Sequence, residues 1–282
     1  MKIILSRKGF DSAYGGYPSP ILPNNKMISL PIPCERDFTK YSDLKIDDET
    51  YYYLMKQLKS KIRYQKKLRE LTKNTKCHLD PDICKEVIER CENWKPCFGQ
   101  INGAQTHLRN EGVKEDDLFL FFGWFKRTKF ENGSLKFDEH EPDLHIIFGY
   151  LQIGEKKQVN NGTKIPDWMQ NHPHAREEYR KISNRKSNNN KIYVARDNLT
   201  WDESKSGAGV FKFNEKLILT KTGFSRSRWE LPEFFKKAII SYHSEESWKK
   251  EYFQSAPIGQ EFIIKDNGEV ENWAKEIINN NG

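Results

Sequence analysis

Several patterns that identify common protein classes are missing from this sequence. Its five cysteines do not form the close Cys-x-x-Cys pairs of structural zinc sites. It contains no P-loop or dinucleotide-binding fingerprint, and no nucleophile-elbow, kinase, zinc-deaminase or zincin motif. No apolar run approaches the roughly 20 residues that are needed to cross a bilayer. We therefore predict no metal, no cofactor and no membrane association.

A secretion signal and internal repeats are missing as well. Met1 and Lys2 lead directly into an apolar segment, and the number of cysteines is odd, so we expect a cytoplasmic protein with reduced thiols. At 282 residues the chain can bury a substantial core. Because no linker stands out, we predict one domain, residues 1–282, with a polar insertion at about 155–190. No obligate protein partner is evident.

What the sequence does contain is a moderate excess of positive charge and many aromatic rings. The formal net charge is +7, and aromatic residues make up 13% of the chain. A basic, aromatic-rich protein suits a polyanionic partner whose bases can stack on flat rings. Many soluble enzymes share this composition, so the signal for nucleic-acid binding is weak.

Apolar runs predict the strands of a central sheet. The runs 3–5 and 118–125 have no polar face, which is typical of strands that are buried on both sides. Asn132 and Gly133 favour a hairpin turn. Further strands are expected at 27–33, 145–153, 191–196, 209–213 and 217–220, with a short hairpin near 262–264. Because strands outnumber helices, we predict an α/β fold, with α+β as the alternative, built on a single mixed, partly antiparallel central sheet flanked by helices.

Helical spacing of apolar residues predicts a long helix from Asp48 to about Thr72 with a basic exposed face. A shorter helix is expected from Asp80 to Cys91, which would place Cys84 and Cys91 on one face. Other helices are expected near 174–183, 234–243 and 270–278, and the run 188–190 of asparagines is expected to be a loop tip.

The first candidate site follows the first strand directly. Strand ends that face glycine-rich loops are where α/β proteins place ligands. Arg7 and Lys8 can hold a phosphate or a developing anion, and Asp11 can orient a hydroxyl or activate water. Tyr14 lies in the same loop. The alternative is a β-hairpin with a polar turn.

Carboxylates and a histidine form a second candidate. His78, Asp80 and Asp82 lie together and could do acid/base work or bind a divalent metal, although helix capping explains them equally well. Asp117 immediately precedes a buried strand, where its carboxylate reaches a site or caps the strand end.

Other polar residues suit the recognition of a base. Gln100, Gln105 and His107 can read a base edge, but a helical surface explains them more simply. His172 and His174 flank a proline, and a substrate-contacting or lid loop is favoured over a metal site because no third ligand lies nearby in sequence.

Two cations and an indole occur together near residue 228. Arg226, Arg228 and Trp229 suit phosphate contact with stacking, or form a surface loop over a core tryptophan.

Together these segments resemble the third family of nucleotide modification associated domains. The resembling segments, which extend over nearly the whole chain, are 6–11, 16–21, 78–82, 98–100, 117–125, 207–209 and 229–232. That family is named for phage and bacterial loci that handle modified DNA bases. The resemblance implies a role with modified bases in DNA or in antiphage defence, and it does not fix the reaction.

Within that context we expect a DNA glycosylase that acts on double-stranded DNA. Its substrate would be a modified pyrimidine, such as a glycosylated hydroxymethyl pyrimidine, that is flipped out of the duplex. Asp11, or an acid from Asp80 and Asp82 with His78, would assist cleavage of the base–sugar bond. The alternatives are a non-catalytic reader of modified DNA, a base-modifying transferase and a metal-dependent nuclease.

Overall fold

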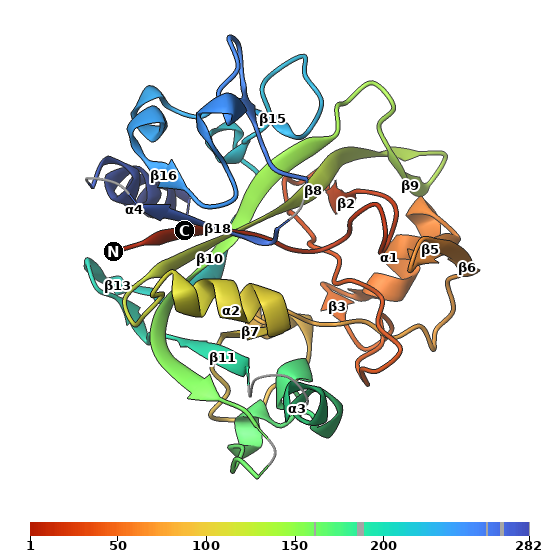
Figure 1. Ribbon diagram of the computed structural model, residues 1–282. Helices are drawn as coiled ribbons and strands as arrows, with labels where there is room; N and C mark the ends of the chain where they lie inside the picture. The colour runs from red at the N-terminus through yellow and green to blue at the C-terminus, as the bar shows by residue number, and fades with distance from the viewer. Residues whose placement is uncertain (161, 185–188, 258, 266–267, 282) are drawn as a thin grey trace.

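The fold is organised around one long strand, β8 (Leu118–Glu131), at the centre of a ten-stranded sheet. The computed structural model describes residues 1–160, 162–184, 189–257, 259–265 and 268–281. The main path of the sheet runs β16-β18-β1-β8-β10-β11-β7 (Figure 1). Its other strands are β1 (Ile3–Arg7), β7 (Cys97–Ile101), β10 (Leu144–Gln158), β11 (Asn190–Ala195), β16 (Ile239–Ile240) and β18 (Glu261–Lys265).

Strand β8 makes the sheet mixed. It pairs in parallel with β1 and then, further along, with β2 (Ser19–Ile21), while β10 runs antiparallel on its other side. The predicted mixed sheet is therefore confirmed. Because β1 and β2 share one edge of β8, the connection 8–18 must leave the sheet between them, and it carries the first predicted site. Short strands β9 (Ser134–Phe137) and β14 (Ala208–Val210) pair with β8 and β10.

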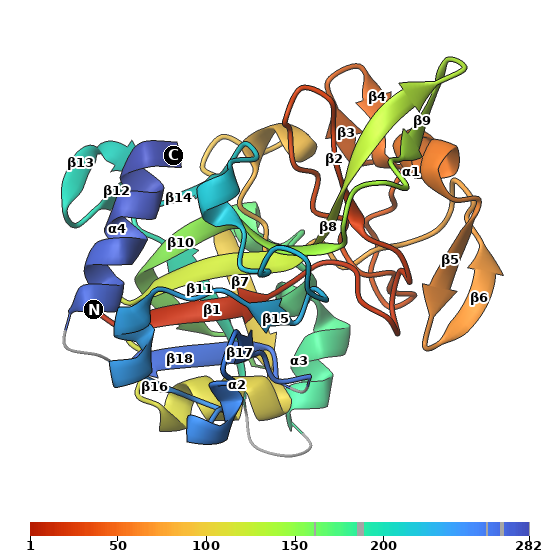
Figure 2. The ribbon, with the colours of Figure 1, turned by 90° about the horizontal axis from the view of Figure 1, so that it is seen from above.

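The apolar runs that predicted strands form the larger hydrophobic core. Leu118, Phe119, Leu120, Phe121 and Phe122 are fully buried, because β8 is covered on both faces. Figure 2 shows α2 (Asn102–Asn110) and α4 (Glu269–Asn281) on opposite sides of the strands β1 and β18.

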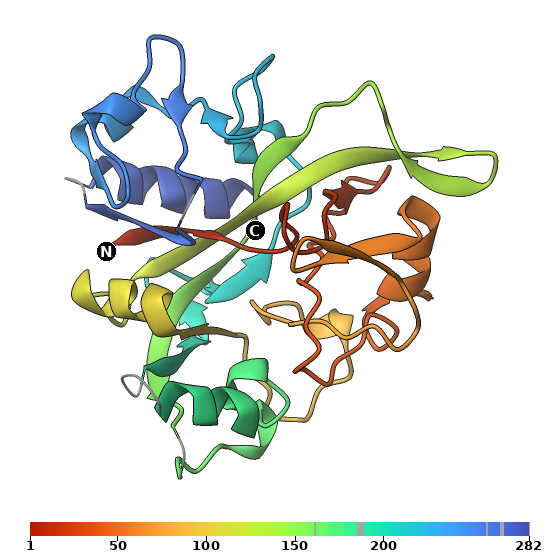
Figure 3. The ribbon, with the colours of Figure 1, turned by 45° about the vertical axis from the view of Figure 1, so that its right-hand side comes forward.

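A second hydrophobic cluster lies beside the sheet. It is formed largely by residues 10–77 and includes the buried face of α1 (Tyr51–Leu58). Figure 3 shows this part of the chain next to the far end of β8 and β9, and α1 contacts β9. Small strand pairs complete the structure: β3 (Lys45–Ile46) with β4 (Glu49–Thr50), β5 (Lys61–Tyr64) with β6 (Lys67–Glu70), β12 (Asn198–Leu199) with β13 (Asp202–Ser206), and β15 (Arg228–Trp229) with β17 (Phe253–Gln254).

The predicted helix 48–72 is wrong beyond Leu58. Thr50 caps the short helix α1 by accepting a hydrogen bond from the Tyr53 amide. The chain then forms the hairpin β5–β6, whose turn at Gln65 and Lys66 has φ of 49° and 65°. Left-handed residues in a two-residue hairpin turn are usually Asn or Gly, so this turn carries no sequence signal.

The predicted helix 80–91 is also wrong. Asp82 instead forms a β-bridge with Cys97, and a single 3-10 turn follows at Lys85–Val87. Cys84 and Cys91 therefore do not share a helical face. Cys77 and Cys97 are the buried thiols among the five free cysteines.

The remaining predictions are mixed. Strands at 145–153 and 191–196, the hairpin at Asn132 and Gly133, and the final helix are confirmed. The predicted strand 217–220 begins instead as a 3-10 turn (Glu215–Leu217). The predicted helix 234–243 is a 3-10 turn (Glu233–Lys237) that is followed by β16. The predicted strand 27–33 forms only isolated β-bridges. The strand β18 pairs with β1 and β16 instead of forming its own hairpin.

The polar segment 155–190 folds against the edge of the sheet. It contains 3-10 turns at Asp167–Met169 and Pro173–Ala175, and the helix α3 (Glu177–Asn184) near its predicted place. Within the described residues, none of the helices has the length and hydrophobicity to cross a membrane.

Candidate functional site

A polar cavity of about 630 Å³ lies where the connection after β1 meets the polar segment and the second hydrophobic cluster. It gathers eight of the predicted site residues from segments far apart in the sequence. These are Arg7, Lys8, Asp11, Tyr14, His78, Asp80, Gln100 and His174. Ligand pockets typically have volumes of about 300–1,000 Å³, so the cavity is large enough for one nucleoside.

The two cations at the end of β1 already have partners inside the protein. The Arg7 guanidinium donates to the carbonyl oxygen of Ala256 at 2.6 Å and lies over the rings of Phe122 and Phe262. Burial lowers the pKa of Arg7, and the charge of Asp11 opposes this effect. Arg7 therefore ties the loop after β17 to the cavity wall.

Lys8 forms a buried ion pair that sequence reasoning missed. Its Nζ lies 2.8 Å from Oε1 of Glu261, and the exposed fractions of the two side chains are 8% and 1%. Gln100 Nε2 donates to the same oxygen at 2.7 Å, while the other carboxylate oxygen is without a hydrogen-bond partner among the described residues. The charge of Lys8 is thus balanced within the site. The amide of Gln100 is also occupied, because its oxygen accepts from the Ile101 amide.

Asp11 is held by the turn that follows it. Its Oδ1 accepts from the amides of Ala13 and Tyr14, each at 2.7 Å. Within the described part of the chain, no hydrogen bond engages the second carboxylate oxygen, Oδ2. Asp11 is exposed and lines the cavity. Asp11 is therefore an oriented carboxylate that a bound molecule can reach.

His78 is oriented by a carboxylate from the second hydrophobic cluster. Its Nδ1 lies 2.8 Å from Oδ2 of Asp37, and the Tyr179 hydroxyl approaches both groups at 3.2 and 3.3 Å. Burial lowers the pKa of His78, but the hydrogen bond and charge of Asp37, aided by Asp80, outweigh it and raise the pKa. Neither Asp37 nor Tyr179 was predicted, because each lies far from His78 in sequence.

Asp80 is a buried carboxylate that stays ionised. Its Oδ1 accepts from the Gly99 amide at 2.7 Å and lies 3.2 Å from Nε2 of His172. Burial acts to raise the pKa of Asp80, but His172 and the other two imidazoles lower it to about 2. Asp80 can therefore stabilise a positive charge or bind a cation at neutral pH, and it cannot donate a proton there.

His174 is neutral, and its tautomer follows from its partner. Nδ1 lies 2.8 Å from Oδ1 of Asn190, whose amide nitrogen donates to the carbonyl oxygens of Val159 and His174. The Asn190 oxygen must accept, so Nδ1 carries the proton and Nε2 has a free lone pair. Burial lowers the pKa of His174 to about 3. Asn189 and Asn190 are both buried, so the predicted loop tip is wrong for these two, and Asn188 lies outside the described residues.

A second polar cavity, of about 650 Å³, lies on the other side of Asp11. It shares Arg7 and Asp11 with the first cavity and is also lined by Trp124 and Arg226. The Arg226 guanidinium lies 4.0 Å from the centre of the Trp124 ring and donates to the Ser12 hydroxyl. The turn at Asp11 therefore separates two polar cavities, and Arg226 is a cation beside it.

Eight predicted residues are not among those that line the first cavity. Arg226 lines the second cavity and His172 lies beside Asp80, while the other six have partners elsewhere. Asp82 accepts from Arg90 and Trp94, Gln105 accepts from the Tyr193 hydroxyl, and His107 bonds Ser241. Asp117 caps the backbone at Lys2 and Lys114, Arg228 packs on Tyr252, and Trp229 is a core residue that donates to His145. The structural alternatives are confirmed for Asp117, which caps the backbone before β8, and for Trp229, which is a core residue. They are wrong for Asp82, because no helix begins there, and for Gln105, which is buried and not on a helical surface.

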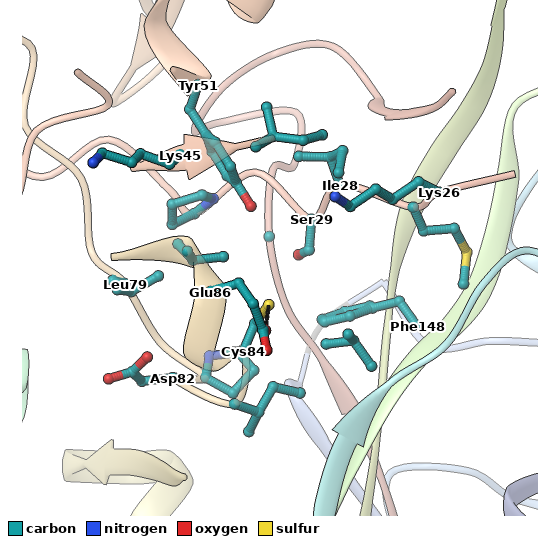
Figure 4. Close-up of a pocket in the computed structure, with 18 of the residues that line it drawn as sticks. Lys26, Ile28, Ser29, Lys45, Tyr51, Leu79, Asp82, Cys84, Glu86 and Phe148 are labelled. Atoms are coloured by element: carbon teal, nitrogen blue, oxygen red, sulfur yellow. Dashed lines mark hydrogen bonds between the residues drawn. The ribbon is translucent and has the colours of Figure 1, made fainter. Parts of the chain in front are cut away.

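A third cavity, of about 680 Å³, is mainly apolar and borders the first one through Gly9 and Asp80. Figure 4 shows Tyr51, Phe148, Leu79 and Cys84 around it. Charged residues also line it, among them Lys26, Lys45 and Glu86, but it contains neither Asp11 nor the histidines of the first cavity.

Comparison with known proteins adds a family. The sequence matches the family described as nucleotide modification associated domain 3 over residues 2–265. No curated protein and no solved structure matches the chain. The match extends over both polar cavities and all ten strands of the sheet.

Proposed function

Because the chain belongs to the nucleotide modification associated domain 3 family, we propose that it acts on modified bases in DNA as a glycosylase. The bond cleaved is the N-glycosidic bond of a modified pyrimidine, such as a glycosylated hydroxymethylcytosine, in antiphage defence. The observation that carries this proposal is the accessible Asp11 carboxylate between two polar cavities.

The first cavity suits a base that has left the duplex. A flipped nucleotide needs a pocket of its own size, with rings for stacking and polar groups for its edge. Tyr14 and Tyr179 line the cavity, and Gln260 adds an exposed amide that sequence reasoning did not single out. Gln100 supports the pocket through Glu261 and does not face a base with a free amide.

The second cavity suits the DNA backbone. Phosphate contacts from arginine position a protein on DNA without reading its sequence. Arg226 occupies this cavity next to Asp11, so a phosphate held there would bring the adjoining sugar to the carboxylate. Arg228, which was predicted for the same role, is exposed and points its guanidinium at Tyr252.

The reaction requires a group that stabilises positive charge on the sugar or orients the attacking water. Asp11 is suited to this role because its Oδ1 is fixed by two amides while its Oδ2 is available to substrate. Water adds at C1′ of the sugar, the base leaves with a proton, and an abasic site remains. Asp80 lines the same cavity as a second carboxylate, whose lowered pKa keeps it ionised at neutral pH.

The test uses two DNA duplexes of the same sequence, one with glycosylated hydroxymethylcytosine and one with unmodified cytosine. After incubation with the protein and treatment with alkali, we expect strand breaks at modified positions of the first duplex only. Intact sugar–base bonds together with metal-dependent strand cuts would favour a nuclease. Intact DNA that remains bound to the protein would favour a reader.

A further inference from the structure

We propose that His78, Asp80 and His174 bind one divalent transition-metal ion at the inner end of the first polar cavity. Each residue offers one ligand atom, and these atoms lie within 4.8 Å of one another. Two ligands held about 2.0–2.2 Å from one metal ion are themselves about 3–4 Å apart, so small side-chain movements close the site. Neither the family description nor any sequence motif assigns a metal here, and the sequence itself led us to predict none.

The hydrogen bonds around the two imidazoles are those of metal ligands. A histidine that binds a metal almost always donates its other ring N–H to a carboxylate or another oxygen. Nδ1 of His78 faces Asp37 Oδ2, and Nδ1 of His174 faces Asn190 Oδ1, both at 2.8 Å. Both rings are thereby oriented through Nδ1, which leaves Nε2 as the atom available to an ion.

Asp80 is arranged in the same way. Its Oδ1 is held by the Gly99 amide and lies against His172, whereas Oδ2 has no recorded partner among the described residues. His172 accepts through Nδ1 from the His174 amide, so its Nε2 carries the proton that faces Asp80. His172 Nε2 lies 3.2 Å from Asp80 Oδ1 without hydrogen-bond geometry, so His172 is a polar neighbour of the carboxylate and, with its proton on Nε2, not a fourth ligand.

The neighbouring charges permit a cation. Lys8 lies in the same cavity, but its ammonium is paired with Glu261. Asp37 and Asp80 bring two negative charges to the group. An overlapping set of Cys34, Asp37 and His78 is a weaker candidate, because Asp37 and Nδ1 of His78 already bond each other and the Tyr179 hydroxyl.

The ligand types indicate the class of metal. Two imidazoles with one carboxylate suit Zn²⁺, Fe²⁺, Mn²⁺ or Co²⁺, while Mg²⁺ and Ca²⁺ prefer sites made of oxygen. Three protein ligands leave coordination positions open toward the cavity, as in catalytic metal sites. A water molecule bound there would be a stronger nucleophile than bulk water, close to where the proposed substrate lies.

The inference is independent of the proposed glycosylase reaction, because its test measures bound metal without DNA. Tag-free full-length protein is stripped with a chelator, titrated with Co²⁺ and Zn²⁺, and followed by calorimetry and by the visible absorption of Co²⁺. We expect one ion per chain and an increase in melting temperature with either metal, because a ligand that binds the native state stabilises it.

Variants then locate the ion. Asp80→Asn and His174→Gln should lose stoichiometric binding, whereas Asp37→Asn should keep one site with affinity reduced by about 10–100-fold. His107→Gln, which lies outside the cavity, is the matched control and should bind as the wild type does. If Asp80→Asn and His174→Gln do not fold, the wild-type titration decides alone. Wild-type protein without stoichiometric binding, or folded Asp80→Asn and His174→Gln variants with unchanged binding, would overturn the proposal.

Discussion

Gly99 and His174 lie in contact because Gly99 has no side chain. A Cβ at position 99 would be 2.3 Å from Cδ2 of His174 and 2.9 Å from Cε1 of His172. The Gly99 amide also donates to Asp80 Oδ1. Gly99 of β7 therefore contacts three side chains at the inner end of the cavity, those of Asp80, His172 and His174. Glycine in a strand interior often marks such a close approach.

Gly99→Ala should therefore disrupt the inner cavity. We expect a lower melting temperature and loss of whatever binds at His174, since the ring cannot keep its position beside a methyl group. Gly103→Ala is the control: a Cβ there meets no atom within 4 Å, and alanine in a helix is favoured over glycine by about 1 kcal/mol. Thermal unfolding of both variants provides the comparison. Equal melting temperatures of Gly99→Ala and the wild type would show that the cavity can accept a methyl group between position 99 and the His174 ring.

The ion pair between Lys8 and Glu261 gives a second prediction. Removing one partner of a buried pair typically costs about 3–5 kcal/mol, so Glu261→Gln should lower the free energy of unfolding by roughly that amount. Adding Lys8→Met should restore part of the loss, because no charge is then left unpaired. Denaturant unfolding of both single variants and the double variant measures the coupling. Additive losses would mean that the two side chains do not interact as described.

Because the pKa of buried His145 is lowered, we expect the free energy of unfolding to depend on pH. It is buried and accepts from Trp229 Nε1 at 3.1 Å, and burial, together with the charges of Arg7 and Arg226, holds its pKa well below 6.5. In the unfolded chain the residue binds a proton as the pH falls through about 6.5, while the native state does not. The unfolded state then holds more protons, so the free energy of unfolding decreases as the pH falls. His145→Gln should make this decrease shallower between pH 7 and about pH 5. Identical pH profiles for variant and wild type would contradict the assignment.

Arg226 and Arg228 should differ in their effect on DNA binding. Arg226→Ala should weaken binding to any sequence and reduce the salt dependence by about one phosphate contact, because its guanidinium lies in the cavity beside Asp11. Arg228→Ala should have the smaller effect, since its guanidinium packs on Tyr252 outside that cavity. Binding isotherms at several salt concentrations compare the two. A larger loss for Arg228→Ala would place the DNA elsewhere.

The strands were the more predictable part of the fold, and the reason is local. The segments 118–123 of β8 and 146–151 of β10 are buried and contain no charged residue, so consecutive positions of the sequence predict a strand that is covered on both faces. The hairpin β5–β6 was missed because its turn uses Gln65 and Lys66 at positive φ, and Ile62 and Leu68 also fit a helical spacing.

The site was predictable in its titratable groups and unpredictable in their support. His78, Asp80 and His174 stood out because their side chains carry chemistry. Asp37, Asn190 and Glu261 did not, because each acts only through a partner that is at least 16 positions away in sequence. Such contacts depend on the tertiary structure, and no spacing rule in one sequence reveals them.

The most direct test of the glycosylase proposal measures the released base. Wild-type protein and Asp11→Asn are incubated with DNA that contains glycosylated hydroxymethylcytosine, and free base is quantified by mass spectrometry beside a DNA-binding assay. The proposal predicts that the wild type releases the modified base in equal amount to abasic sites. It also predicts that Asp11→Asn binds DNA as tightly and releases about 100-fold less, within the range typical for the loss of one catalytic group. Absence of free base with the wild type, or equal release by Asp11→Asn, would contradict the account.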